Sequence, residues 1–385
     1  MSDLLDYDAL HKEARQRSGL TDFGAFEYEP ALRALINSIN TESGMNTGGF
    51  WGQRERITNI LVSRARIEEL IKQHPSIADE VINEPVVIVG LPRTGTTMLH
   101  RILASDSRFF APIWFETRFP APKPNEDFRI SDSRIEDGKA EVAGMLEANP
   151  DLASIHPIDA EAPDEEIMLL EQSFYSTMPP SFCSLPSYVQ WLENNDNTPG
   201  YEYLKRLLQV LQWQKKEKGQ GAQRWLMKTP HHLHHMDVLF KVFADAKVVQ
   251  SHRDPLETIP SIASFNTALW KLCADSVDEK IVGEYSARKF AKGMSDTLKV
   301  RSKNPGRVLD VQYRETIKTP FDTIAKVYAF IDMDLTPEAE AAMKQWQTDN
   351  KREDRAAHKY TLEQFGYSEA SLKALFDDYR KAFIL

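Results

Sequence analysis

The stretch Glu84–Ser105, EPVVIVGLPRTGTTMLHRILAS, constrains the fold more than any other part of the chain. Its apolar run from Val86 to Leu91 is typical of a buried parallel strand. Residues 90–97 fit a compact turn, and the spacing of apolar residues from Thr97 onward predicts a helix. A strand, a glycine loop and a helix in this order form a phosphate-binding unit, because loop N–H groups converge on an anion and the helix points its positive end at it.

The loop has the G-x-x-x-x-G spacing of nucleotide phosphate loops, from Gly90 to Gly95. Thr96 stands where users of ATP and GTP carry the lysine that serves the β- and γ-phosphates, so a triphosphate is not favoured. Arg93, inside the loop, is the cationic substitute. Thr97 could ligate Mg²⁺, but no apolar run ending in Asp supplies the partner carboxylate. The loop therefore predicts a site for a nucleotide monophosphate end used without metal; the alternative is an ordinary strand-to-helix turn.

The composition excludes several classes of partner. A net charge of -10 disfavours nonspecific binding to nucleic acid or to an anionic membrane, since both need a positive face. Cys183 and Cys273 form no metal or redox motif, which fits a reducing cytoplasm. The first residues are acidic with a helical pattern, unlike a signal peptide. No apolar run approaches the ~20 residues that span a bilayer.

Four further segments have the character of strands. They are Phe109–Phe115, Arg224–Lys228, Ala246–Ser251 and Gly306–Tyr313. Five strands interleaved with helices predict an α/β fold with a mainly parallel sheet, right-handed crossovers and helices on both faces. We expect one domain over residues 1–385, with a helical N-terminal cap (1–84), an α/β core (85–335) carrying a helical insertion at about 123–223, and a C-terminal helix with a basic tail (336–385).

Charged residues follow several of these strands. In an open parallel sheet, ligands bind outside the carboxyl ends of the strands, which places Glu116, Lys228 and Arg253 near the mouth of the phosphate loop. Glu116 has an alternative interpretation as a surface carboxylate paired with Arg118. Ser261 lies eight residues after Arg253, two turns into a helix that Asp254 caps and Pro255 begins. Arg253 and Ser261 could share a second phosphate; the alternative is an exposed arginine beside a helix cap.

Three groups of residues have competing interpretations. His231 and His235 are four residues apart on a helix predicted over residues 231–243, but no interposed Glu and no third ligand accompany them, so we expect no metal site. Residues 351–360 carry several basic side chains, which form either a solvated face or a flap that closes over an anionic ligand. The aromatic residues of 170–191 either belong to the core or line an apolar acceptor pocket.

Five segments together carry a family resemblance: PRTGTT at 92–97, ETR at 116–118, KTPHHL at 228–233, HRDPLETIPS at 252–261, and the strand-end Tyr313. Their order resembles that of the sulfotransferases that use 3′-phosphoadenosine 5′-phosphosulfate, most closely bacterial members of the branch that includes protein-tyrosine sulfotransferases. The resemblance covers nearly the whole chain after residue 84.

The resemblance implies how the nucleotide is held. The residues that would wrap the 5′-phosphosulfate are Arg93, Thr94, Gly95, Thr96 and Thr97. Arg253 and Ser261 would bind the 3′-phosphate, Tyr313 would line the nucleotide site, and residues 355–360 would close over it. The product would be adenosine 3′,5′-bisphosphate.

The resemblance also implies the catalytic groups. Glu116 matches the base of the tyrosine-sulfating branch, and Lys228 matches the lysine that, with Arg93, stabilises the leaving group. Cytosolic members of the wider family use a histidine base, which makes His231 the alternative. Sulfuryl transfer resembles phosphoryl transfer, in which negative charge builds on the leaving oxygen. We therefore expect a cytoplasmic, metal-independent enzyme that sulfates a hydroxyl of a small-molecule or lipid-like acceptor.

Two other functions fit parts of the pattern. A small-molecule kinase on the same phosphate-loop fold would bind ATP with Mg²⁺. A noncatalytic protein could keep the nucleotide site as a scaffold, although such a protein has no need of Glu116 together with Lys228.

Overall fold

The computed structural model describes residues 4–24, 27–148, 158–350 and 361–385. Within these ranges, five strands form one parallel sheet in the order β2-β3-β1-β4-β5. The strands are β1 (Val86–Gly90), β2 (Phe109–Phe110), β3 (Arg224–Lys228), β4 (Lys247–His252) and β5 (Val308–Gln312). The predicted α/β fold is confirmed, and β1 with the phosphate loop stands at the centre of the sheet.

Helices cover both faces of the sheet, as the sequence predicts. One face packs on the apolar sides of α10 (Thr198–Glu217), α11 (Met236–Val242) and α13 (Glu279–Lys303). The other packs on α4 (Thr96–Leu103), α15 (Pro320–Phe330) and α16 (Pro337–Asp349). All five residues of β1 are buried, because a parallel strand between two helical layers meets apolar side chains on both sides.

The N-terminal helices form a core of their own with part of the insertion. They are α1 (Tyr7–Ser18), α2 (Glu29–Glu42) and α3 (Thr47–Gln73), and η1 (Pro75–Asp79) leads from them to the sheet. Arg64 of α3 is fully buried between the rings of Tyr28 and Tyr203, each 4.1 Å from its guanidinium carbon. It donates to the carbonyl oxygens of Phe23 and Gln172, which joins this core to the insertion.

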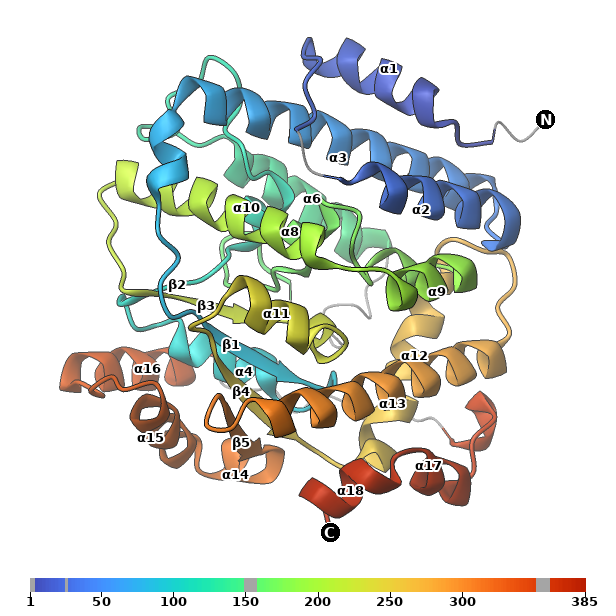
Figure 1. Cartoon of the computed structure of the whole chain (residues 1–385), viewed down its shortest axis with the longest axis vertical. Coiled ribbons are helices and arrows are strands. Elements are labelled where there is room, and N and C mark those ends of the chain that lie inside the picture. The colour runs from blue at the N-terminus through green and yellow to red at the C-terminus, as the bar shows by residue number, and fades with distance from the viewer. Residues whose placement is uncertain (1–3, 25–26, 149–157, 351–360) are drawn as a thin grey trace.

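The insertion contains short helices around the long α10. They are α6 (Arg134–Ala148), α8 (Ile167–Glu171), η2 (Pro179–Ser181) and α9 (Pro186–Asn194). The remaining helices are α12 (Pro255–Lys271), which follows β4, and, toward the C-terminus, α14 (Tyr313–Lys318), η4 (Glu363–Phe365), α17 (Glu369–Leu375) and α18 (Asp377–Phe383). Figure 1 shows α1–α3 on one side of the molecule and α14–α18 on the opposite side, with the sheet between them.

The second strand is shorter than predicted. β2 covers only Phe109–Phe110, and residues Trp114–Arg118 form the helix α5. Pro112 cannot donate to a strand ladder, and beyond it the chain pairs with residues 160–164: Trp114 N–H donates to the carbonyl of Ala162. Glu116 therefore lies in the first turn of a helix rather than at a strand end.

The helix predicted over residues 231–243 is interrupted. A 3₁₀ turn, η3 (Pro230–Leu233), comes first, and α11 begins only at Met236. Thr229 caps this turn by accepting a hydrogen bond from the N–H of His231 at 3.3 Å. The four-residue spacing of His231 and His235 is therefore not a helical spacing.

Candidate functional site

The phosphate loop is fixed by contacts that need its first glycine. A Cβ on Gly90 would lie 2.8 Å from the carbonyl oxygen of Ser251, its neighbour on β4, so only glycine fits. The Ser251 hydroxyl donates to the carbonyl of Thr94 at 2.7 Å, and the Thr94 hydroxyl donates to the carbonyl of Leu91 at 2.7 Å. The loop is thus tied both to itself and to the adjacent strand.

Gly95, the second glycine of the loop, packs against Tyr313, the residue that follows β5. Gly95 has φ 77° and ψ 6°, a left-handed conformation that glycine adopts readily, and it stands just before α4. A Cβ there would lie 3.1 Å from the ring of Tyr313. The N-cap residue Gly95 has no side chain to cap α4, so the backbone N–H groups of Thr96, Thr97 and the loop could hold an anion.

Arg253 joins the phosphate loop to the fourth and fifth strands. Its Nη1 donates to the carbonyl of Arg93 at 2.8 Å, and its guanidinium lies over the Tyr313 ring, 4.3 Å from the centroid. Its Nε donates to Glu257 at 2.9 Å. Ser261 is one turn beyond Glu257 on the same face of α12, since residues four apart on a helix are neighbours. The geometry therefore brings Arg93, Arg253 and Tyr313 together, with Ser261 on the adjoining helix face.

The loop that carries Arg253 is held from the C-terminal end of the chain. Arg380 of α18 forms two hydrogen bonds with the carboxylate of Asp254, both 3.1 Å. Asp254 also caps α12, as predicted, by accepting from Leu256 N–H at 3.0 Å. Tyr379 contacts Nδ1 of His252 at 3.1 Å. Sequence reasoning missed Tyr379 and Arg380, because their partners lie 126–127 residues away.

Lys228 is the last residue of β3, which pairs with β1 on the side opposite to β4. It is paired with Ile88 in the sheet, is 3% exposed, and its ammonium forms an ion pair with Glu165. His100 of α4 contacts the carbonyl of Leu226 on the same strand at 3.3 Å. Burial and the nearby Lys228 ammonium lower the pKa of His100 to about 4. The lysine therefore lies beside the helix that follows the phosphate loop.

Glu116 is buried, and both of its carboxylate oxygens have partners. Oε1 accepts from the ammonium of Lys215 at 2.7 Å, and Oε2 accepts from the N–H of Ile113 at 3.2 Å. The alternative pairing with Arg118 does not occur; Arg118 instead contacts Glu141, at 2.8 Å. The carboxylate is therefore tied to α10 and to the start of its own helix.

His231 and His235, which follow Lys228, are buried. The rings of His231 and His235 are 4.9 Å apart, and Nδ1 of His231 is 3.1 Å from the hydroxyl of Thr177. Burial, reinforced by neighbouring imidazoles, lowers the pKa of His231 far below its usual value, which makes it a weak base. Among the residues that the structure describes, no group of three or more His, Cys, Asp or Glu side chains could hold a metal ion.

Along the carboxyl edge of the sheet the groups stand in the order Lys228, phosphate loop, Arg253, Tyr313. Neighbouring strands are about 5 Å apart, so β3 and β4 are separated by about 10 Å. One nucleotide with phosphates at both ends can reach from one to the other. The basic cluster of residues 351–360 lies outside the described residues.

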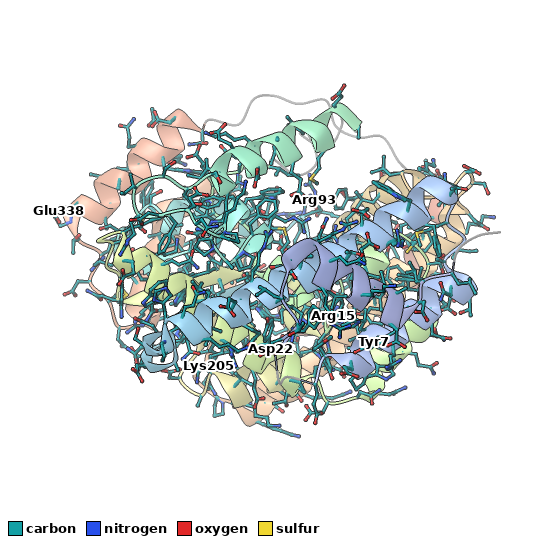
Figure 2. All side chains as sticks on the ribbon, turned by 90° about the horizontal axis from the view of Figure 1, so that it is seen from above. Tyr7, Arg15, Asp22, Arg93, Lys205 and Glu338 are labelled. Atoms are coloured by element: carbon teal, nitrogen blue, oxygen red, sulfur yellow. The ribbon has the colours of Figure 1, made fainter. Side chains whose placement is uncertain are left out.

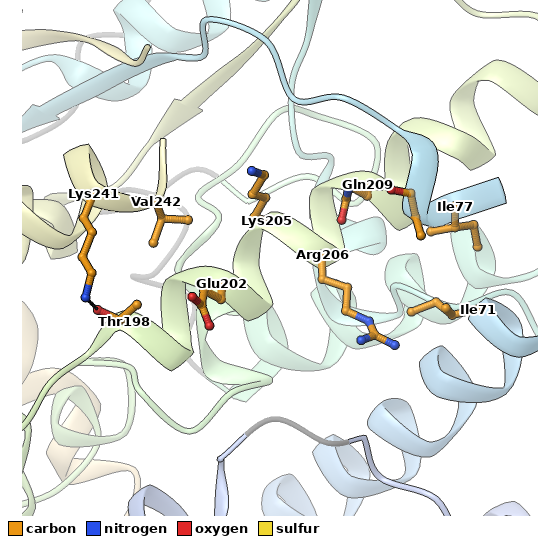
Figure 3. A pocket seen from close by; sticks show the side chains of 10 residues that line it. Ile71, Ile77, Thr198, Glu202, Lys205, Arg206, Gln209, Lys241 and Val242 are labelled. Carbon is orange, nitrogen blue, oxygen red and sulfur yellow. Dashed lines mark hydrogen bonds between the residues drawn. The ribbon is translucent and has the colours of Figure 1, made fainter. Parts of the chain in front are cut away.

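Figure 2 shows Arg93 near the middle of the molecule, with Tyr7 and Glu338 toward opposite sides. A hollow of about 620 Å³ lies elsewhere, along α10, η1 and α11 (Figure 3). Ile71 and Ile77 line one end of it, and at the other end Lys241 donates to the hydroxyl of Thr198 at 2.8 Å. None of the predicted site residues lines this hollow.

Comparison with known proteins gives a consistent result. The model of the Sulfotransferase family matches residues 85–337. Two curated relatives are the omega-hydroxy-beta-dihydromenaquinone-9 sulfotransferases Stf3 of Mycobacterium bovis and Mycobacterium tuberculosis, each 27% identical over 277 residues. The matched region covers 67% of this chain and 65% of the length of each relative.

Two crystal structures resemble the whole chain. Sulfotransferase STF1 from Mycobacterium tuberculosis H37Rv has a TM-score of 0.86 and 28% identity, and the match covers 98% of this chain and 100% of that one. Sulfotransferase STF9 from Mycobacterium avium has a TM-score of 0.88 and 26% identity, covering 100% and 98%. Within the described ranges, no helix is both long and apolar enough to cross a membrane.

Proposed function

This chain belongs to the sulfotransferase family, and we propose that it transfers a sulfuryl group from 3′-phosphoadenosine 5′-phosphosulfate to a hydroxyl of an apolar small-molecule or lipid-like acceptor. The observation that carries the proposal is the contact of Arg253 with both the Arg93 carbonyl and the Tyr313 ring. Through it, a phosphate cradle and a second cationic group share one edge of the sheet.

The residues present fit the proposed donor. Glycine at Gly90 and Gly95 lets backbone N–H groups approach a 5′-phosphosulfate, with Thr94, Thr96 and Thr97 around it. Arg253 would bind the 3′-phosphate together with Ser261, and Tyr313 would line the nucleotide site. Thr96 in place of a phosphate-loop lysine argues against a triphosphate.

The proposed chemistry needs positive charge where the donor's sulfur–oxygen bond breaks. When bound, the donor supplies an activated sulfuryl group whose leaving oxygen gains negative charge. Lys228, Arg93 and the loop amides would stabilise that charge, which is usually the largest catalytic contribution in such sites. The resemblance assigns the acceptor's proton to Glu116, whose carboxylate is tied to Lys215 and Ile113.

The acceptor class is supported by a relative's name. The Stf3 relatives are named for a hydroxylated dihydromenaquinone, an apolar molecule with a hydroxyl at its end. We propose an acceptor of the same chemical class here, an alcohol or phenol with a large apolar body.

Transfer of ³⁵S-labelled sulfate from the donor tests the proposal, with a screen of long-chain alcohols, phenols and hydroxylated quinones as acceptors. We expect product with at least one apolar acceptor and without added metal. Lys228→Ala should keep nucleotide binding to within a few fold of the wild type and slow transfer at least ~100-fold. Mg²⁺-dependent ATP binding without sulfate transfer would favour a kinase, and nucleotide binding without any transfer would favour a scaffold.

A further inference from the structure

Two consecutive carboxylates meet the lysine at the end of β3. The Glu165 carboxylate forms an ion pair with the Lys228 ammonium, and Oε2 of Glu166 accepts a hydrogen bond from the Lys228 backbone N–H at 2.7 Å. Both belong to an acidic segment that follows α6 and precedes α8 in the sequence. The segment therefore contacts both the backbone N–H and the ammonium group of Lys228.

Glu166 has a structural role. It is fully buried, and its Oε1 lies 2.7 Å from Nε2 of His232, whose Nδ1 lies 2.7 Å from the hydroxyl of Tyr201. Burial alone would raise the pKa of Glu166, but its hydrogen bonds with His232 and the Lys228 N–H outweigh burial and lower it. This carboxylate is an ionised anchor that holds the strand end in place.

Glu165 is different because its carboxylate has one partner among the described residues. That partner is the Lys228 ammonium, and the Glu165 side chain is 17% exposed. The Glu165 side chain is thus partly exposed to solvent. It also contacts the Lys228 ammonium, which in the proposed function binds the donor. Once Lys228 turns to a phosphate oxygen, the Glu165 carboxylate is left without its cation beside the transfer site.

The backbone around Glu165 is held on two sides. The N–H of Asp164 donates to the carbonyl of Pro112 at 2.9 Å, and Nε of Arg101, on the helix after the phosphate loop, donates to the carbonyl of Pro163 at 3.2 Å. A carboxylate on so constrained a segment keeps its position relative to the loop, which proton transfer requires.

We infer that Glu165, rather than Glu116, accepts the proton of the acceptor hydroxyl, an inference that rests on the proposed function. The acceptor oxygen forms a bond to sulfur as the bond from sulfur to the bridging phosphate oxygen breaks. The electron pair of that bond stays on the phosphate, next to Lys228, and the hydroxyl proton moves to a carboxylate oxygen of Glu165. The products are a sulfate ester and adenosine 3′,5′-bisphosphate.

The ion pair between Glu165 and Lys228 predicts a second effect, on nucleotide binding, that can be measured separately from transfer. Without nucleotide, Glu165 competes with the donor for the Lys228 ammonium. Removing its charge should therefore tighten nucleotide binding while it removes the base. A residue with a merely structural role would not give these two opposite effects.

The experiment compares Glu165→Gln, Glu165→Asp, Glu116→Gln and the control Glu161→Gln, a charge-neutralising change at an exposed residue of the same segment whose partner is Lys139. Calorimetry with adenosine 3′,5′-bisphosphate measures binding, and single-turnover sulfate transfer measures the chemical step. We expect Glu165→Gln to bind about threefold more tightly and to transfer ~100-fold more slowly. Glu165→Asp should recover part of the rate, and Glu161→Gln should match the wild type in both.

Two results would overturn the inference. One is near-normal transfer by Glu165→Gln with loss of transfer in Glu116→Gln, which returns the base to Glu116. The other is a parallel fall of affinity and rate in Glu165→Gln, which makes the residue structural. Failure of the wild type to transfer sulfate at all refutes the proposed function instead, and the binding measurements then identify what the site holds.

Discussion

Replacing Gly95 by alanine tests the junction between the phosphate loop and Tyr313. Gly95 has φ 77° and ψ 6°, where an L-residue is less stable than glycine by ~1–2 kcal/mol. Alanine also restricts the unfolded chain, which returns ~0.4–1 kcal/mol. The backbone alone should therefore lower the free energy of unfolding by about 1 kcal/mol.

The new methyl group adds a contact. Its carbon would lie 3.1 and 3.3 Å from two atoms of the Tyr313 ring, so the ring must move by a few tenths of an ångström. Crowding of this kind adds about 1 kcal/mol, for a total near 2 kcal/mol. Because Arg253 stacks on the same ring, we also expect nucleotide affinity to fall about tenfold.

Gly19→Ala is the matched control. Gly19 ends α1 at φ 73° and ψ 5°, and a Cβ there would meet nothing within 4 Å. Urea denaturation should show a loss of about 1 kcal/mol for Gly19→Ala and about twice that for Gly95→Ala. Calorimetry with adenosine 3′,5′-bisphosphate should show a loss of affinity in Gly95→Ala alone. Equal stability losses with unchanged affinity would refute the contact between loop and ring.

Three further predictions concern charged groups outside the loop. Arg380→Ala should weaken binding of adenosine 3′,5′-bisphosphate about fivefold by releasing Asp254; unchanged affinity in calorimetry would show that α18 does not position the Arg253 loop. Lys215→Met should lower the free energy of unfolding in urea by ~3 kcal/mol, because it leaves Glu116 buried without its cation. Adding Glu116→Gln should restore much of the loss, and no restoration would contradict the pairing. Burial lowers the pKa of Lys289 to about 8, so the unfolded chain binds its proton more tightly and stability should rise between pH 8 and the ordinary lysine value. Lys289→Met should abolish that rise in urea unfolding measured across this range, and an unchanged pH dependence would assign it to another group.

The elements that sequence predicted correctly are those that local chemistry decides. The apolar run at β1, the glycine loop and the cap formed by Asp254 before Pro255 each depend on residues within one short segment. Their signals are strong because a fully buried strand and a helix start each require particular residue types.

The errors come from contacts between distant segments. The chain beyond Phe110 leaves the sheet because Pro112 lacks an N–H and residues 160–164 offer another partner, which no local pattern at Phe109–Phe115 reveals. The 3₁₀ turn after Lys228 likewise contacts distant segments: the hydroxyl of Tyr201 on α10 lies 2.7 Å from Nδ1 of His232, and the hydroxyl of Thr297 on α13 donates to the carbonyl of Leu233 at 2.8 Å.

The residues of the candidate site that stand at strand ends could be predicted from the sequence, but the distant residues that contact them could not. Arg93, Lys228, Arg253 and Tyr313 follow strands of one parallel sheet, so their shared edge could be expected. Glu165 lies 63 residues before its partner Lys228. The acidic run at 161–166 was visible in the sequence, but only the folded chain connects it with the lysine.

We propose that one nucleotide bisphosphate contacts both the phosphate loop and Arg253. Calorimetric titration of the wild type and of Arg253→Ala with adenosine 3′,5′-bisphosphate, in the absence of divalent metal, tests it most directly. We expect one bound nucleotide per chain and at least ~10-fold weaker binding in the variant, because the variant loses a charge-assisted hydrogen bond. Equal affinity in the two proteins, or binding only of ATP with Mg²⁺, would contradict it.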